Sequence, residues 1–216
     1  MNTHLIIEAL AAVQRAILDS ESQIESLDRA IGDGDHFINV RRGCEVTVAL
    51  SPDLKDMPPG LALHKIGMKL LGTIGGASGP LISSFFMAMG KTLEGVDEPD
   101  RRLFAEAFTS GVEAIKLRGK ADVGEKTMLD VLIPVSRLLL KLADEEVSLS
   151  VMCAQITEEA HRNMLATRDM IASKGRASFL GERALGHIDP GCKTCEVVIA
   201  AVCDTVLQHN QAQETT

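Results

Sequence analysis

The sequence has no tryptophan and no tyrosine, and aromatic residues make up only 3% of its 216 positions. Proteins that bind single-stranded nucleic acid stack the bases on aromatic side chains. The formal net charge is −8, whereas nucleic acids and anionic membranes attract positively charged surfaces. Both features argue against a nucleic-acid partner.

The sequence also lacks a run of about 18 uncharged apolar residues, which a membrane-spanning helix would need. The apolar stretch at the N-terminus carries Glu8, Arg15 and Asp19, so it predicts an amphipathic helix rather than a signal peptide. Five cysteines, an odd number, accompany no secretion signal. We therefore expect reduced thiols and a cytoplasmic protein without a membrane partner.

Apolar residues recur at helical spacing, as in Ile6, Leu10 and Val13, and no segment alternates with a period of two. The pattern predicts an all-α fold with one domain over residues 1–210 and a frayed polar tail at 211–216. Eight helices are expected, near residues 3–20, 37–50, 61–74, 79–94, 100–118, 126–143, 148–173 and 194–208.

The connections between these helices are of two kinds. The second, fourth and sixth are ordinary acidic or proline-containing turns, whereas the first, third, fifth and seventh hold most of the glycines and polar residues. In an up-and-down antiparallel bundle, the odd-numbered connections all lie at one end. The alternation therefore predicts one site at one end of the bundle.

The first of these connections, "DRAIGDGDH", carries Asp28, Asp33 and Asp35. Carboxylate oxygens are ligands for Mg²⁺, and three carboxylates this close repel one another unless a cation neutralises them. The alternative is a solvated acidic turn in which Asp35 caps the next helix. The spacing alone leaves both interpretations open.

The third and seventh connections contain residues suited to phosphate. "GGASGP", residues 75–80, opens a helix whose free N–H groups would attract an anion. The long segment 174–191 offers Arg176 and Arg183, which could bind phosphate through two N–H groups. The alternatives are a flexible turn capped by Ser78 and a packed crossover with surface arginines.

Cys192 and Cys195 form a C-x-x-C pair at a helix start. A redox pair or half of a zinc site is one interpretation. A structural role is favoured, because the sequence has no second C-x-x-C. Three acids, a Gly-Ser turn and an arginine-bearing loop at one end together predict a site for Mg²⁺ and a nucleotide.

"LDRAIGDGDH", "GGASGP", "GEKTMLDVL" and "KGRASFLGERALGHIDPG" follow one another between about Leu5 and Val206. These motifs resemble those of the DhaL family, the nucleotide-binding subunits of dihydroxyacetone kinases. The resemblance implies an antiparallel barrel of eight helices with the nucleotide at one end. It also implies two Mg²⁺ ions on Asp28, Asp33 and Asp35, and ADP or ATP as the nucleotide. The residues implied to contact the nucleotide are His36, Phe37, Ile38, Asn39, Ala77, Ser78, Gly119, Met128, Arg176, Asp189, Pro190 and Gly191.

The family usually has glycine where this chain has Phe37. The resemblance further implies a kinase subunit without a catalytic side chain of its own, inactive without a DhaK-like subunit that holds dihydroxyacetone. In phosphoenolpyruvate-dependent members, a DhaM-like phosphotransferase subunit rephosphorylates the bound ADP. The alternatives are a subunit that exchanges ATP and serves another ketose such as erythrulose, and a regulatory binding module. The sequence also leaves a homodimer open.

Overall fold

A computed structural model describes residues 2–76, 78–145 and 147–214, and over these residues the chain is helical without a strand. The prediction of an all-α fold is therefore confirmed. The helices are α1 (Thr3–Asp19), α2 (Glu21–Ile31), α3 (His36–Val48), α4 (Ser51–Leu54), α5 (Pro59–Leu71), α6 (Ser78–Thr92), α7 (Arg101–Gly119), α8 (Leu129–Asp144), α9 (Leu149–Ala166) and α10 (Pro190–Glu214). Two 3₁₀ segments, η1 (Thr167–Asp169) and η2 (Arg176–Ala184), precede α10.

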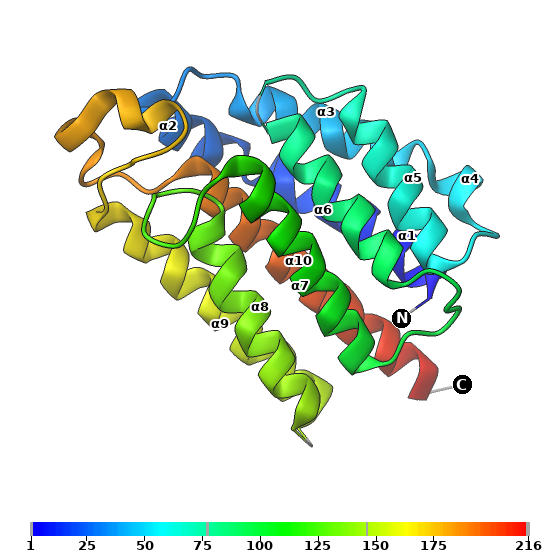
Figure 1. The fold of residues 1–216 in the computed structure, drawn as a ribbon. Coiled ribbons are helices and arrows are strands. Elements are labelled where there is room, and N and C mark those ends of the chain that lie inside the picture. Colours follow the sequence, from blue (N-terminus) through cyan, green and yellow to red (C-terminus); the bar gives the residue numbers. More distant parts are fainter. Residues whose placement is uncertain (1, 77, 146, 215–216) are drawn as a thin grey trace.

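The long helices lie side by side and alternate in direction (Figure 1). Contacts run from α1 to α3, from α3 to α5, and then from each long helix to the next as far as α10, which packs back on α1. This order leaves the segments 32–35, 72–76, 120–128 and 167–189 at one end of the bundle, which we call the site end. The labelled chain ends lie toward the opposite end, the far end (Figure 1).

Two large groups of buried apolar side chains fill the interior. One joins α7, α8, α9 and α10, and the other joins α1, α5, α6 and α7. The helices α5 and α6 approach especially closely, because a Cβ added at Gly60 would lie 2.7 Å from the Leu93 carbonyl oxygen and one added at Gly90 would lie 2.6 Å from the Gly60 carbonyl oxygen. Neither position has room for a larger residue, so these glycines fix the distance between the two helices.

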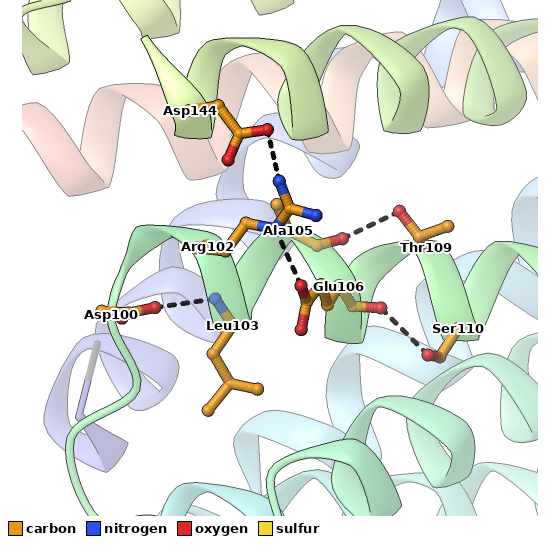
Figure 2. A network of polar contacts seen from close by, with 8 residues as sticks. All are labelled: Asp100, Arg102, Leu103, Ala105, Glu106, Thr109, Ser110 and Asp144. Atoms are coloured by element: carbon orange, nitrogen blue, oxygen red, sulfur yellow. Dashed lines mark hydrogen bonds and ion pairs between the residues drawn. The ribbon is translucent and has the colours of Figure 1, made fainter. Parts of the chain in front are cut away.

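Paired charges and a helix cap hold the start of α7 at the far end (Figure 2). The Asp100 carboxylate accepts a hydrogen bond of 2.7 Å from the Leu103 N–H. Arg102 pairs with Glu106 one turn along α7, at 2.8 Å, and with Asp144 at the end of α8. The acids of this network have cationic or N–H partners within the chain.

The structure differs from the predicted elements in several places, including the short helix α4 in a connection predicted to be a turn. Residues 21–31, expected as a connection, form α2, because Ile24 and Ile31 lie on one helical face and are buried. The helix expected over 148–173 ends at Ala166, and the long connection after it contains η1 and η2. The last helix runs to Glu214, so residues 211–214 of the expected frayed tail are helical. Among the described residues, no helix is both long enough and apolar enough to cross a membrane.

Candidate functional site

Three aspartates meet at the site end. Asp28 lies in the last turn of α2, and Asp33 and Asp35 lie in the turn between α2 and α3. Each offers a carboxylate oxygen within 4.8 Å of the others. Asp28 is buried, with its Oδ2 accepting a hydrogen bond of 3.0 Å from the His36 N–H, whereas Asp33 and Asp35 are exposed. The structure thus brings together the three aspartates that the sequence singled out.

Glycines shape the turn that carries these aspartates. A Cβ added at Gly32 would lie 1.8 Å from Oδ1 of Asp28, so only glycine leaves the Asp28 carboxylate in its place. Gly34 adopts φ +80°, a conformation that other residues rarely adopt. The two glycines are thus required for the aspartates to converge.

The charge of this cluster is only partly balanced within the protein. Arg176 of η2 pairs with Asp33 at 2.8 Å between Nε and Oδ2, and no salt bridge in the described part of the chain reaches Asp28 or Asp35. Desolvation raises the pKa of Asp35, a hydrogen bond and repulsion from Asp33 raise it further, and a hydrogen bond with Asn39 lowers it. Clustered oxygen donors with unbalanced charge fit a hard divalent cation such as Mg²⁺.

The start of α3 lies directly beside the aspartates. His36 Nε2 lies 2.8 Å from Thr194 Oγ1 of α10, and burial lowers the pKa of His36. Phe37 is 1% exposed and packs with Ile17, Ile24 and Val197. The predicted contact of Phe37 with a nucleotide can therefore involve only its backbone.

The other predicted residues of α3 are more accessible. Ile38 is 44% exposed, and Asn39 is half-buried. The Gly-rich turn lies next to them, because a Cβ added at Gly75 would lie 3.8 Å from Asn39 Oδ1. Ser78 begins α6, with its hydroxyl 3.5 Å from the Gly75 carbonyl oxygen. Ala77 lies outside the described residues.

The predicted residues of the fifth and seventh connections also lie at the site end. A Cβ added at Gly119 would lie 3.3 Å from Leu81 of α6, and one added at Gly191 would lie 3.7 Å from Met128 Cβ. The seventh connection contacts the first through the Arg176–Asp33 pair and the fifth through the hydrogen bond between Ser173 and Glu125. Arg176 reaches an aspartate, whereas Arg183 is exposed near the end of η2.

Asp189 and Pro190 begin α10. The Asp189 carboxylate accepts a hydrogen bond of 2.8 Å from the Cys192 N–H, and Pro190 is buried as the first helical residue. Burial raises the pKa of Asp189 to about 6. Asp189 thus caps α10, which begins at the site end.

The cysteine pair does not form a reactive centre. Cys192 donates to the Thr127 carbonyl oxygen at 2.9 Å, and burial raises the pKa of Cys192 well above its usual range and that of Cys195 to about 12. Both are free thiols. Since a thiolate is the reactive and metal-binding form, the structural interpretation of this pair is supported.

Sequence reasoning missed one residue of the fifth connection and one in the first turn of α8. Asp130 is buried and accepts hydrogen bonds from the N–H groups of Gly124, at 2.5 Å, and Thr127, at 2.7 Å. The T-x-x-D pattern of residues 127–130 is a capping-box signal that could have indicated this role. Lys126 is also buried, and no sequence pattern predicts that a lysine in a loop will be buried.

Comparison with known proteins places this geometry in a family. Residues 30–204 match the DAK2 domain. The chain is 38% identical over 176 residues to the ADP-binding subunit DhaL of the phosphoenolpyruvate-dependent dihydroxyacetone kinase of Escherichia coli, covering 81% of this chain and 84% of the relative. It is 36% identical over 201 residues to the corresponding subunit of Lactococcus lactis, covering 93% of this chain and 96% of the relative.

A solved structure shows the same architecture. The dihydroxyacetone kinase of C. freundii, solved with AMP-PNP and Mg²⁺, matches with a TM-score of 0.73 at 26% identity. The match covers 94% of this chain and 34% of the kinase, so this chain spans about a third of that protein's length. Together with the domain match over most of the chain, these likenesses show that the protein belongs to the DAK2 domain family.

Proposed function

We propose that this protein is the nucleotide-binding subunit of a phosphoenolpyruvate-dependent dihydroxyacetone kinase. The observation that carries the proposal is the convergence of three aspartate carboxylates within 4.8 Å at the site end. The two relatives named above are ADP-binding subunits of such kinases. The related kinase of known structure was solved with an ATP analogue and Mg²⁺.

The site residues have separate tasks in this proposal. Asp28, Asp33 and Asp35 would hold two Mg²⁺ ions, which neutralise charge on the phosphates. The helix starts at His36–Asn39 and at Ser78 would direct N–H groups toward the phosphates, and Ala77 would be a further nucleotide contact. Gly119 and Met128 would border the adenine, and Arg176 with Asp189, Pro190 and Gly191 would close the pocket. The cycle of long helices would be the eight-helix barrel of the family.

Phosphoryl transfer needs positioning and charge neutralisation more than a covalent step on the protein. The chain's own contribution would therefore be to bind, orient and shield the nucleotide. A DhaK-like subunit would hold the ketose at the site end, and a DhaM-like subunit would resupply the phosphoryl group. Without its DhaK-like partner, the chain would not turn over.

The missing tryptophan and tyrosine give a direct test, because a retained adenine would dominate the ultraviolet spectrum of the purified protein. We expect the adenine band to survive extensive dialysis in Mg²⁺ buffer and to disappear after dialysis against EDTA. Asp35→Ala should lose the band in both buffers. A wild-type protein that shows no Mg²⁺-dependent binding of ADP by calorimetry would contradict the proposal.

A second candidate is an ATP-exchanging subunit for another ketose. The L-erythrulose 1-kinase of Mycolicibacterium smegmatis is 28% identical over 200 residues, covering 91% of this chain and 34% of that kinase. Combining this chain with a DhaK-like subunit separates the two candidates. Turnover that requires a DhaM-like chain and phosphoenolpyruvate supports resident ADP, whereas turnover with free ATP supports exchange. Nucleotide binding without turnover of either ketose would indicate a regulatory module.

A further inference from the structure

The buried side chain of Lys126 lies in an enclosure of backbone carbonyl groups. Its residue is 1% exposed and has φ +59°. The Nζ atom lies within hydrogen-bonding distance of four carbonyl oxygens, those of Thr167 at 2.9 Å, Met170 at 3.1 Å, Ala184 at 2.7 Å and His187 at 2.7 Å. The ammonium group has three N–H donors, so two of these oxygens share one N–H. An ammonium group has only donors, so it matches a site built from acceptors.

The four carbonyls come from four different points of one segment. Thr167 begins η1, Met170 follows it, Ala184 ends η2, and His187 lies in the connection before α10. These short 3₁₀ pieces have few regular backbone hydrogen bonds of their own, so the Lys126 contacts replace those that a longer helix would make. Lys126 thus contacts four points of segment 167–189, which is also joined internally by a hydrogen bond of 2.9 Å from the Gly186 N–H to the Arg168 carbonyl oxygen.

The backbone of Lys126 is itself fixed in place. Asp130 holds the neighbouring N–H groups of Gly124 and Thr127, at 2.5 and 2.7 Å. Beside it, Glu125 accepts a hydrogen bond from the Ser173 hydroxyl at 2.8 Å, and its carbonyl oxygen accepts one of 3.3 Å from the Ser173 N–H. The lysine is therefore anchored to α8 on one side and to the segment on the other.

The segment held in this way carries site residues. Arg176, which pairs with Asp33, lies along the chain between Met170 and Ala184, whose carbonyl groups both contact Lys126. Asp189 follows two residues after His187, and its N–H donates to the Thr167 hydroxyl at 3.1 Å. The enclosure of Lys126 and the closing side of the pocket are thus parts of the same piece of chain.

We propose that Lys126 is a positioning residue, an internal cation that keeps segment 167–189 folded against the site end and so keeps Arg176 beside the aspartate cluster and Asp189 at the start of α10. The charge is essential to this role, because without it four carbonyl oxygens would each lose a donor in a buried space. The effect on nucleotide binding rests on the function proposed above, whereas the effect on the segment does not.

The first test is amide hydrogen exchange of the full chain without nucleotide. Lys126→Met keeps an unbranched apolar side chain and removes the charge. The matched control is Lys120→Met, since Lys120 lies in the same connection, also has positive φ (+48°) and is exposed. We expect Lys126→Met to speed exchange about tenfold or more within 167–189 and to leave α5 and α6 unchanged. Lys120→Met should match the wild type.

Two exchange results would overturn the proposal. One is wild-type protection of residues 167–189 in Lys126→Met. The other is loss of the helical circular dichroism of the whole protein, because Lys126 would then support the entire fold rather than this segment. Lys126→Arg, which keeps the charge and the donors, should restore at least part of the protection. Equal exchange in Lys126→Arg and Lys126→Met would show that the charge is not the cause.

The second test is the dissociation constant for ADP with Mg²⁺, measured by calorimetry on the same variants. Lys126→Met should weaken binding by about 10- to 100-fold, as is typical when a group supporting metal ligands is removed, and Lys120→Met should not. Unchanged affinity in Lys126→Met would overturn the link to the site. If the wild-type protein binds no ADP, the proposed function fails, and the exchange experiment still decides the structural role of Lys126.

Discussion

The acids around Arg102 at the far end and the aspartate cluster at the site end differ in how many cationic partners they have. At the far end, Arg102 lies between Glu106 and Asp144, and Lys65 pairs with Asp53 at 3.0 Å. At the site end, three aspartates share the single cation of Arg176. Exposed ion pairs add little stability, whereas unpaired clustered carboxylates lower it. In the proposed function, this lower stability at the aspartate cluster accompanies a site for a divalent cation.

The pKa shifts of Arg102 and Asp35 agree with this difference. At the far end, the hydrogen bond to Glu106 and then that to Asp144 raise the pKa of Arg102, as expected where opposite charges stabilise each other. At the site end, desolvation and Asp33 raise the pKa of Asp35, which shows that its ionised form is disfavoured there. A divalent cation would reverse that preference.

Removing one acid from each end should give the sharpest contrast. Asp35→Ala should weaken binding of ADP with Mg²⁺ by about 100-fold or more, because it removes a metal ligand. Asp144→Ala removes one acid at the far end and should leave binding unchanged. Calorimetry measures both. The melting temperature of Asp35→Ala without ligand should equal or exceed that of the wild type, and gross unfolding of this variant would contradict a binding role.

Adding ADP with Mg²⁺ should balance the charge of the aspartate cluster and so stabilise the folded protein. ADP with Mg²⁺ binds the folded state, so at about 100 times the dissociation constant it should raise the free energy of unfolding by about 2.7 kcal/mol. Thermal melts with ADP alone, with Mg²⁺ alone and with both should show the large shift only with both. A melting temperature that does not respond to the combination would contradict the predicted site.

The pH dependence should also distinguish the site end. The pKa of Asp189 is raised to about 6 in the folded state, above its value in an unfolded chain. The folded state therefore binds the proton more tightly, and stability rises as the pH falls through 6. Without nucleotide, Asp189 should add about 1 kcal/mol to the free energy of unfolding between pH 7 and pH 5.

Asp189→Asn keeps a capping oxygen for α10 and removes the titration. Denaturant unfolding of both proteins at several pH values measures the contribution of Asp189, because other titrating groups such as His36 cancel in the difference. Parallel pH profiles for the wild type and Asp189→Asn would show that the Asp189 pKa is not raised.

The smallest effect is expected at the far end. Arg102→Ala breaks two exposed ion pairs, and its melting temperature should stay close to that of the wild type, because exposed ion pairs add little stability. Added salt should reduce the difference further. A large drop in the melting temperature, or any change in nucleotide affinity, would show that the far end does more than hold α7 and α8 together.

The sequence predicted the helical class and the meeting of Asp28, Asp33 and Asp35, because helical spacing and glycine-rich turns are local signals. It did not predict α2. This helix buries only two apolar residues, Ile24 and Ile31, and it leads directly into the glycine-rich turn, so the whole stretch was expected to be a connection. The buried position of Phe37 depends on Ile17, Ile24 and Val197, which lie on three other helices. Residues that come together only on folding leave no local pattern.

The burial of Lys126 also could not be predicted from the sequence. In the sequence, it is one lysine in a polar connection, and most lysines in such positions are exposed. Its burial depends on carbonyl groups at residues 167–187, and the backbone has no side-chain letter to reveal them. Asp130 was more accessible to prediction, because its partner Thr127 lies three positions away.

The segment held by Lys126 can also be given an optical signal. Phe179 of η2 is 83% exposed, and the chain contains no tryptophan. A tryptophan substituted for Phe179 would be the sole indole of the protein, so its fluorescence would report this segment alone. Changes in the surroundings of segment 167–189, such as those expected in Lys126→Met, could then be followed in real time. The measurement would need no label and would have no tryptophan background from the rest of the molecule.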